Sequence, residues 1–263
     1  SVNLFIPGEL NDKTFGVRQE TKFPFIETHS SDLPTPCSAT TNIVFTKAGD
    51  YTLAVRHPAW AGEEYKITVN GEDVAVNVTK GKASYATINR SWKVGDVVRV
   101  YLPMELRYEE CPNYTDYIAF KFGPILLGAQ TTATSSNESS VTGLPFEQLQ
   151  NVYGGEGRMD HAPGSRASSM SLTKAPLLIG NRANVLDRIQ VKDLSQLKFT
   201  IDASRPDVAS YTWNQLELRP FYDIHHARYM CYWYQQTAEN YANSDMAASE
   251  AANEALLKRT LDF

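Results

Sequence analysis

The sequence predicts an all-β fold of two antiparallel, jelly-roll-like β-sandwich modules followed by one C-terminal α-helix, and three observations lead to this prediction. Short β-prone runs recur at a spacing of roughly ten residues and are separated by turn residues. The pair Asn70-Gly71 lies between two alternating runs and is a strong local signal for a β-hairpin. The stretch 237–259 contains neither Pro nor Gly and carries an apolar stripe of helical period.

Length and composition limit the kinds of protein that this chain can be. Its 263 residues are enough for one large β domain or two smaller ones, and its apolar and charged fractions, 42% and 21%, are ordinary for a globular protein. The net charge of −5 provides no basic surface for nucleic acid. No apolar run approaches the roughly 20 residues that span a bilayer. We therefore expect neither nucleic acid nor a membrane among its partners.

The first module is expected to take residues 1–103. A strand is predicted at residues 2–6, and alternation predicts further strands that Gly49-Asp50, Asn70-Gly71 and Gly95-Asp96 separate as turns. Pro103 is expected to end the last of these strands, because proline cannot donate a hydrogen bond to a central ladder.

The second module is expected at residues 104–218. Two apolar strands, 118–122 and 125–127, are split by Gly123-Pro124, and strand-like runs return at 177–179, 197–201 and 216–218. Between them, the polar stretch 131–175 shows no periodicity and predicts a long loop.

The segment 236–263 is predicted to be the C-terminal helix. Thr237 can cap its start and Glu239 lies in the first turn, whereas Lys258 and Arg259 lie in the last turn, as the helix dipole prefers. The apolar stripe then favours one uninterrupted helix over 237–259.

The run 221–234 is the densest in aromatic residues and is the first place to look for a binding site. Its aromatics could form a platform for sugars, and Asp223, His225 and His226 could ligate a metal. The alternative is a central strand, in which adjacent residues point to opposite faces, so that the two histidines could not hold one ion. We predict no metal site. The candidate substrate-binding residues are Trp60, Tyr222, His225 and Tyr229.

No catalytic residue is predicted. The adjacent pairs Glu63-Glu64 and Glu109-Glu110 diverge in direction, whereas glycoside hydrolysis needs two carboxyl groups facing one bond. Nucleophile-elbow, zinc-protease and phosphate-loop motifs are absent from the sequence. The cysteines, which are Cys37, Cys111 and Cys231, lie far apart and are expected to be buried thiols, although one disulfide between two of them stays open. No cofactor is expected in this chain.

Several segments in a fixed order resemble glycoside hydrolase family 127, once a domain of unknown function, whose members include β-L-arabinofuranosidases. They are VNLFIPGEL at 2–10, RHPAWAG at 56–62, VNG at 69–71, INRSWKVGD at 88–96, LPM at 102–104, AFKFGPILLG at 119–128 and LRPFYDIHHARYMCYW at 218–233. Any one of these segments alone is weak evidence for the family, but together and in this order they are fairly specific for it.

The resemblance implies that the chemistry lies outside this chain. In that family an (α/α)6 barrel precedes two β-sandwich modules; it uses a glutamate as acid/base and a cysteine of a zinc-thiolate cluster as nucleophile. None of these residues maps onto a position here, and zinc is expected only in the barrel of the parent protein. The resemblance also implies that the last strand, near 219–235, returns to the first sandwich.

We therefore expect a non-catalytic scaffold region of a glycoside hydrolase that acts on arabinose-containing plant-type glycans. The chain has no initiator methionine and starts within a predicted strand, which indicates an excised segment whose partner is the missing N-terminal barrel. The barrel would leave an apolar face around Leu4, Phe5, Tyr222 and His225. The alternative is an independent pair of carbohydrate-binding modules with exposed aromatics such as Trp60 or Tyr229. A third hypothesis, that the chain is a complete enzyme, has no catalytic motif in the sequence to support it. For the parent protein we expect a periplasmic or extracellular location rather than a cytoplasmic one.

Overall fold

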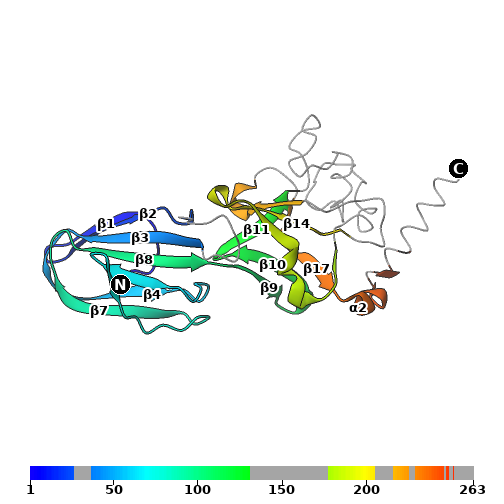
Figure 1. The fold of residues 1–263 in the computed structure, drawn as a ribbon, viewed down its shortest axis with the longest axis horizontal. Helices are drawn as coiled ribbons and strands as arrows, with labels where there is room; N and C mark the ends of the chain where they lie inside the picture. Colours follow the sequence, from blue (N-terminus) through cyan, green and yellow to red (C-terminus); the bar gives the residue numbers. More distant parts are fainter. Residues whose placement is uncertain are drawn as a thin grey trace, which may run out of the picture. The chain divides into compact units, whose positions relative to one another are not determined.

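The structure is a computed structural model that describes residues 1–26, 37–130, 177–204, 216–224, 229–245, 247–248 and 251. Within these ranges the chain consists of β-strands, almost all antiparallel, with a few short helical turns, which confirms the all-β fold class (Figure 1). The chain divides into two compact units. The first comprises residues 1–106, 122–125 and 194–196, and the second comprises residues 107–121, 126–193 and 197–263.

The first unit consists of two β layers (Figure 1). One layer is a six-stranded sheet in the order β1-β2-β3-β8-β5-β6, and the other is the pair β4-β7. The bounds are β1 Gly8–Asn11, β2 Gly16–Thr21, β3 Cys37–Phe45, β4 Gly49–His57, β5 Lys66–Val69, β6 Glu72–Val74, β7 Ser84–Trp92 and β8 Val97–Met104.

The core of the first unit lies between these two layers. Alternate residues of the strands are buried, and they are Ile43, Phe45, Leu53, Val55, Ala86, Ile88, Val98 and Val100. The ring of Trp92 stacks on Phe45 with centroids 4.0 Å apart, and its indole N–H donates to the carbonyl of Tyr51 at 3.0 Å. Each large apolar side chain buried in this way contributes about 1.5–3 kcal/mol. Trp92 is therefore part of the core of the first unit.

Two of the predicted turns are present with the expected backbone. Asn70 and Gly71 join β5 to β6 with φ of 53° and 88°, and Gly95, with φ of 90°, lies between β7 and β8. Only Gly and, less readily, Asn adopt such positive φ angles at low cost. Gly49 differs from its prediction, because it begins β4 instead of forming the turn before it.

Three strand boundaries in the first unit differ from those predicted. Residues 2–6 form no strand; Val2 makes one isolated bridge to Val55. Val74, Val76 and Val78 alternate as in a strand, but β6 ends at Val74. Pro103 lies inside β8 opposite Ser38, and its carbonyl accepts the amide of Gly62 at 3.1 Å. At Pro103, β8 pairs only with β3, because its pairing with β5 ends at Tyr101. The N–H group that proline lacks therefore leaves no hydrogen bond between strands unmade.

The second unit is built on a sheet in the order β12-β17-β10-β11-β15-β14-β13, with β9 beside β10 and β16 beside β11. The bounds are β9 Leu106–Cys111, β10 Tyr114–Phe122, β11 Ile125–Gln130, β12 Leu178–Ile179, β13 Ile189–Asp193, β14 Lys198–Ile201, β15 Leu216–Pro220, β16 Tyr229–Met230 and β17 Trp233–Gln236. Its largest fully buried side chains include Phe120, Phe199, Leu127 and Trp233.

The described strands within residues 219–235 pair with strands of the second unit and not with the first sandwich, so that prediction is wrong. In the second unit, β15 and β16 pair with β11, whereas β17 pairs with β10. The β10–β11 hairpin and β9 together leave some backbone groups unpaired, and these later strands pair with part of them. The run 221–234 is not a single strand either. It begins with a 3-10 turn at Phe221–Asp223 and has two short strands at its end.

The C-terminal helix starts where predicted but is shorter. Helix α2 spans Ala238–Ala242, and the Thr237 hydroxyl accepts the amide of Asn240 at 3.2 Å. The prediction of an uninterrupted helix is wrong at Asn243 and Ser244. The Ser244 hydroxyl donates to the Tyr241 carbonyl at 2.7 Å and accepts the amide of Ala247 at 3.2 Å. Such bonds from a serine side chain to the backbone compete with a continuous helix.

Much of the predicted helix after residue 245, and the predicted loop 131–175, lie outside the described residues. No helix in the described ranges is long and apolar enough to cross a membrane.

Candidate functional site

The predicted binding residues that the structure describes belong to two different units. Trp60 is half-buried in the first unit, where its ring lies 6.0 Å from that of Phe23. Tyr222 and Tyr229 belong to the second unit. Tyr222 is 46% exposed, and Tyr229 packs edge-on against Phe221 with centroids 4.8 Å apart. His225 lies outside the described residues.

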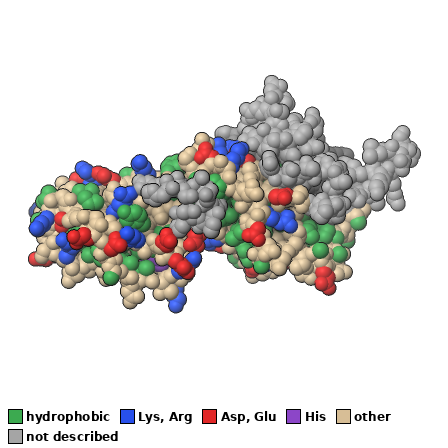
Figure 2. Space-filling model, viewed as in Figure 1, with side chains coloured by type: hydrophobic (Ala, Val, Ile, Leu, Met, Phe, Trp, Pro, Cys, Tyr) green, Lys and Arg blue, Asp and Glu red, His purple; other side chains and the backbone are tan. Residues whose placement is uncertain are grey.

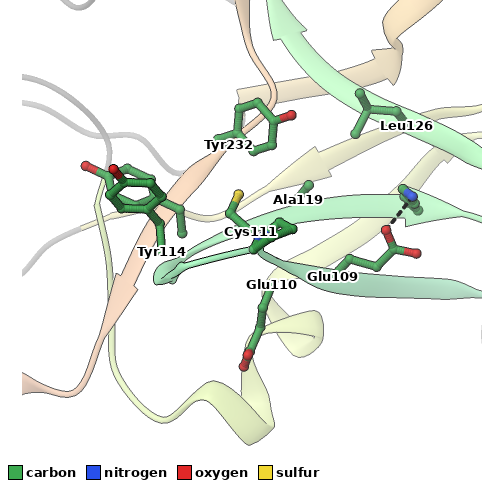
Figure 3. Close-up of a pocket in the computed structure, with 10 residues that line it drawn as sticks. Glu109, Glu110, Cys111, Tyr114, Ala119, Leu126 and Tyr232 are labelled. Carbon is green, nitrogen blue, oxygen red and sulfur yellow. Dashed lines mark hydrogen bonds and ion pairs between the residues drawn. The ribbon is translucent and has the colours of Figure 1, made fainter.

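A different group of side chains lines a recess of about 600 Å³ on the second unit (Figure 3). We call it the tyrosine recess, and its lining residues are Glu109, Glu110, Cys111, Pro112, Tyr114, Tyr117, Ala119, Lys121, Leu126 and Tyr232. Alternate residues of a strand point to one face, and this places Tyr117, Ala119 and Lys121 of β10 on the same side.

Two tyrosines of the recess are unusually open to solvent. Tyr114 is 70% exposed and Tyr232 is 56% exposed. In Figure 3 Tyr232 lies on one side of Cys111 and Ala119, and Tyr114 lies on another. Tyr117 is half-buried and packs edge-on against Tyr234, with centroids 5.5 Å apart. The side chains of Cys111 and Ala119, which lie between the tyrosine rings, are small and leave room for a ligand that contacts the aromatic faces.

The charged groups of the recess are paired. The Glu109 carboxylate accepts hydrogen bonds from both Lys121 and Arg107. The hydrogen bond from Lys121 holds the pKa of Glu109 below its ordinary value, although partial burial acts in the opposite direction. Glu110 extends away from Tyr232 in Figure 3 and pairs with Arg182 at 2.5 Å.

The pKa shifts disfavour two chemical roles in the recess, that of a general acid for Glu109 and that of a nucleophile for Cys111. A carboxyl group with a lowered pKa is ionised at neutral pH and cannot serve as a general acid there. Partial burial raises the pKa of the Cys111 thiol, so the nucleophilic thiolate is disfavoured.

The first unit carries an apolar groove of about 320 Å³. We call it the N-terminal groove, and its lining residues are Asn3, Leu4, Phe5, Ile6, Phe23, Arg56, Pro58, Trp60, Pro124 and Ile125. Leu4 and Ile6 are 62% and 59% exposed. Phe5 was expected to be exposed as well, but it is buried and packs against Phe23 at 6.4 Å, so that prediction is wrong.

The cysteines and the acidic residues provide no metal site within the described ranges. There, no group of three or more His, Cys, Asp or Glu side chains could hold an ion. Cys37 and Cys231 are buried free thiols, as predicted, whereas Cys111 is free but only half-buried. On the face of the first unit shown in Figure 2, acidic and basic side chains are interspersed instead of forming a patch of one sign.

Most of the recess was not predicted from the sequence. Glu109 and Glu110 were considered only as a carboxylate pair, and neither Tyr114 nor Tyr117 was a candidate residue. Two signals were present. Tyr117, Ala119 and Lys121 alternate along one strand, and Pro112-Asn113 forms a hairpin turn in which Asn113 has φ of 66°. These patterns predict that β9 and β10 form a hairpin, but they do not predict that Tyr232 lines the same recess.

Comparison with known families gives a match for each unit. Residues 1–104 match the family model described as the β-L-arabinofuranosidase GH127 middle domain, and residues 107–235 match DUF4986, a domain of unknown function. A search of curated proteins found no significant match.

Solved structures resemble the chain at low sequence identity. A GH127 β-arabinofuranosidase matches with a TM-score of 0.51 and 19% identity over 88% of this chain and 33% of its own. A GH127 β-L-arabinofuranosidase from Geobacillus stearothermophilus T6 has a TM-score of 0.48 and 16% identity, and covers 89% of this chain and 33% of its own. A third structure, named only as a glycoside hydrolase, has a TM-score of 0.46 and 18% identity, and covers 84% of this chain and 32% of its own. This chain thus spans about a third of the length of these proteins, and the first similarity indicates a shared fold.

Proposed function

We propose that this chain, which matches a GH127 middle domain at residues 1–104 and a DUF4986 domain at residues 107–235, is a non-catalytic accessory region of a glycoside hydrolase. The match of residues 1–104 to a middle domain of β-L-arabinofuranosidases carries this proposal. It also favours an arabinose-containing glycan as the substrate of the whole protein.

The chemistry of the described residues supports a non-catalytic role. Glycoside hydrolysis needs an acid and a second carboxylate or another nucleophile on either side of one bond. Here Glu109 is held by Lys121 and Arg107, and Glu110 is paired with Arg182. The raised pKa of the Cys111 thiol disfavours its thiolate form. A separate catalytic barrel, of the kind that the family resemblance implies, would then supply the acid/base glutamate, the nucleophile and the zinc.

The N-terminal groove supports a scaffold role. Leu4 and Ile6 are large apolar side chains with more than half of their surface exposed, and Trp60 lies in the same groove. Apolar surface of this kind is costly in water, and it commonly marks a contact with another domain. In the proposal, the catalytic barrel of the same protein covers it.

Activity assays on the chain of 263 residues test the proposal directly. We expect no hydrolysis of an aryl β-L-arabinofuranoside above a heat-inactivated control, and no stoichiometric zinc by elemental analysis after dialysis. Turnover that Glu109→Gln or Cys111→Ala abolishes would place catalysis in the recess and refute the accessory role. About one zinc ion per chain would contradict the assignment of the metal to the barrel.

A further inference from the structure

We propose that the tyrosine recess of the second unit binds a neutral oligosaccharide. The inference deepens the proposed function, on which it rests, because the saccharide would be part of the glycan that the hydrolase attacks. It concerns a surface that neither family description assigns to a ligand.

The aromatic side chains supply the first argument. A sugar ring has a C–H face that packs against the face of an aromatic ring, and tyrosine adds a hydroxyl that can hydrogen-bond at the edge. Tyr114 and Tyr232 are the two most exposed tyrosines that the structure describes, and both line one recess. Two such rings beside a floor of Cys111 and Ala119 form a concave, largely apolar surface, which is typical of small-ligand sites.

The ion pair at the base of the recess supplies the second argument. Glu109 is anchored by two cationic side chains, so its carboxylate is held in a defined orientation. A carboxylate has about four lone-pair positions and a lysine ammonium has three donors, so both Glu109 and Lys121 keep capacity for neighbouring sugar hydroxyls. Fixed polar groups beside an apolar wall provide orientation and specificity.

The charge balance points to a neutral ligand. Lys121, the cation among the lining residues, is paired with Glu109, and Arg182 is paired with Glu110. An acidic sugar would have to compete with these carboxylates for the same cations. A neutral saccharide can hydrogen-bond to the pair without separating it.

Binding can be followed at the floor of the recess through Cys111. Cys37 and Cys231 are buried, whereas Cys111 is half-buried and lines the recess, so it should react first with iodoacetamide. We expect neutral arabino-oligosaccharides to slow alkylation of Cys111 in the chain of 263 residues, as measured by mass spectrometry. Oligogalacturonate, which is anionic, should protect less at equal concentration.

Variants then locate the site. Tyr232→Ala and Tyr114→Ala should each weaken the saccharide affinity about tenfold, as truncation of an aromatic anchor typically does. Affinity is measured by calorimetry, with circular dichroism as the test of folding. Ala119→Leu, which fills the floor and removes no aromatic, should also block binding. The matched control is Tyr222→Ala, since Tyr222 is an exposed tyrosine of the same unit outside the recess lining. It should leave the affinity unchanged.

The possible failures are distinguishable. Absence of any saccharide binding, or tighter binding of oligogalacturonate, would overturn this inference and leave the accessory role intact. Equal loss on Tyr222→Ala and Tyr232→Ala would also overturn it, because the site would not be the recess. Protection of Cys111 by the catalytic barrel without saccharide would identify the recess as a domain contact instead. Hydrolysis by the chain alone would refute the proposed function itself.

Discussion

Asp96 and Asn70 link three strands of the first unit through a small set of hydrogen bonds. The Asn70 amide donates to Asp96 at 2.9 Å, and its side-chain oxygen accepts the amide of Val97 at 2.9 Å. Asp96 also accepts the amide of Lys93 at 2.8 Å and is buried. The β5–β6 hairpin is thereby joined to the turn that leads into β8. The bonds from Asn70 and Lys93 favour the ionised carboxylate, so the pKa of Asp96 lies below its ordinary value.

Replacing Asp96 by alanine should destabilise the first unit by about 1–3 kcal/mol at neutral pH, because it removes the hydrogen bonds that the carboxylate accepts from Asn70 and Lys93. The folded-state pKa is lowered, so the charge-dependent part of this stabilisation is complete above the unfolded pKa of about 4 and is lost as the pH falls through the folded value. The difference between wild type and Asp96→Ala should therefore shrink below about pH 4.

Urea unfolding combined with hydrogen exchange in β5 and β8 measures this difference between the two proteins. Glu72→Ala, at an exposed position of β6 in the same hairpin, is the control and should change stability little. An equal difference between wild type and Asp96→Ala at pH 3 and pH 7 would show that ionisation of Asp96 plays no part.

At the scale of the elements, hairpin turns set where the strands begin and end. Gly71 closes the β5–β6 hairpin with φ of 88°, and Gly123 closes the β10–β11 hairpin with φ of 53°. An added methyl group at Gly123 would come within 2.9 Å of the Met104 side chain, whereas at Gly71 it meets no atom within 4 Å. The requirement for glycine is thus purely conformational at Gly71 and both conformational and steric at Gly123.

Gly71→Ala is expected to destabilise the first unit by about 1–2 kcal/mol, the cost of a left-handed backbone for a residue with a Cβ atom. Gly8→Ala is the matched control. Gly8 also has no atom near an added methyl group but lacks a positive φ, so its replacement should be close to neutral. Urea midpoints of the two variants and the wild type provide the comparison. Equal effects at both positions would mean that backbone strain is not what selects glycine at the turn.

At the scale of the whole molecule, the two proposals rest on two surfaces among the described residues, one in each unit. The first unit has the N-terminal groove, and the second unit has the tyrosine recess. The two surfaces differ in chemistry, since Leu4 and Ile6 are aliphatic whereas the recess combines tyrosines with an ion pair. This difference is why we assign a protein domain to the groove and a saccharide to the recess.

Leu4→Asp and Ile6→Asp should weaken association with a separately expressed catalytic barrel, because each places a charge on the exposed apolar groove. Sedimentation velocity measures the association, and circular dichroism tests the fold. Phe5→Asp should instead unfold the first unit, since Phe5 is buried.

Val94→Asp is the matched control for the groove variants. Val94 is 68% exposed in the same unit but does not line the groove, so its replacement should leave the association unchanged. Association that survives both Leu4→Asp and Ile6→Asp would place the barrel contact elsewhere.

The sequence by itself determined the features that depend on neighbouring residues. Asn70-Gly71, Gly123-Pro124 and Gly95 marked turns because backbone preference is local, and period-two burial marked the strands between them. The ordered segments that resemble family 127 were likewise readable from the chain, and the family matches agree with them.

Only the tertiary structure decided which distant segments meet. Nothing local in residues 219–235 shows that they complete the β10–β11 hairpin, because the partner of a strand depends on which backbone groups remain open elsewhere. Phe5 is buried and Leu4 exposed for a similar reason, since the difference depends on contact with Phe23. The recess needs Glu109 and Tyr232 side by side although 123 positions separate them in the chain, and only folding of the sheet brings them together.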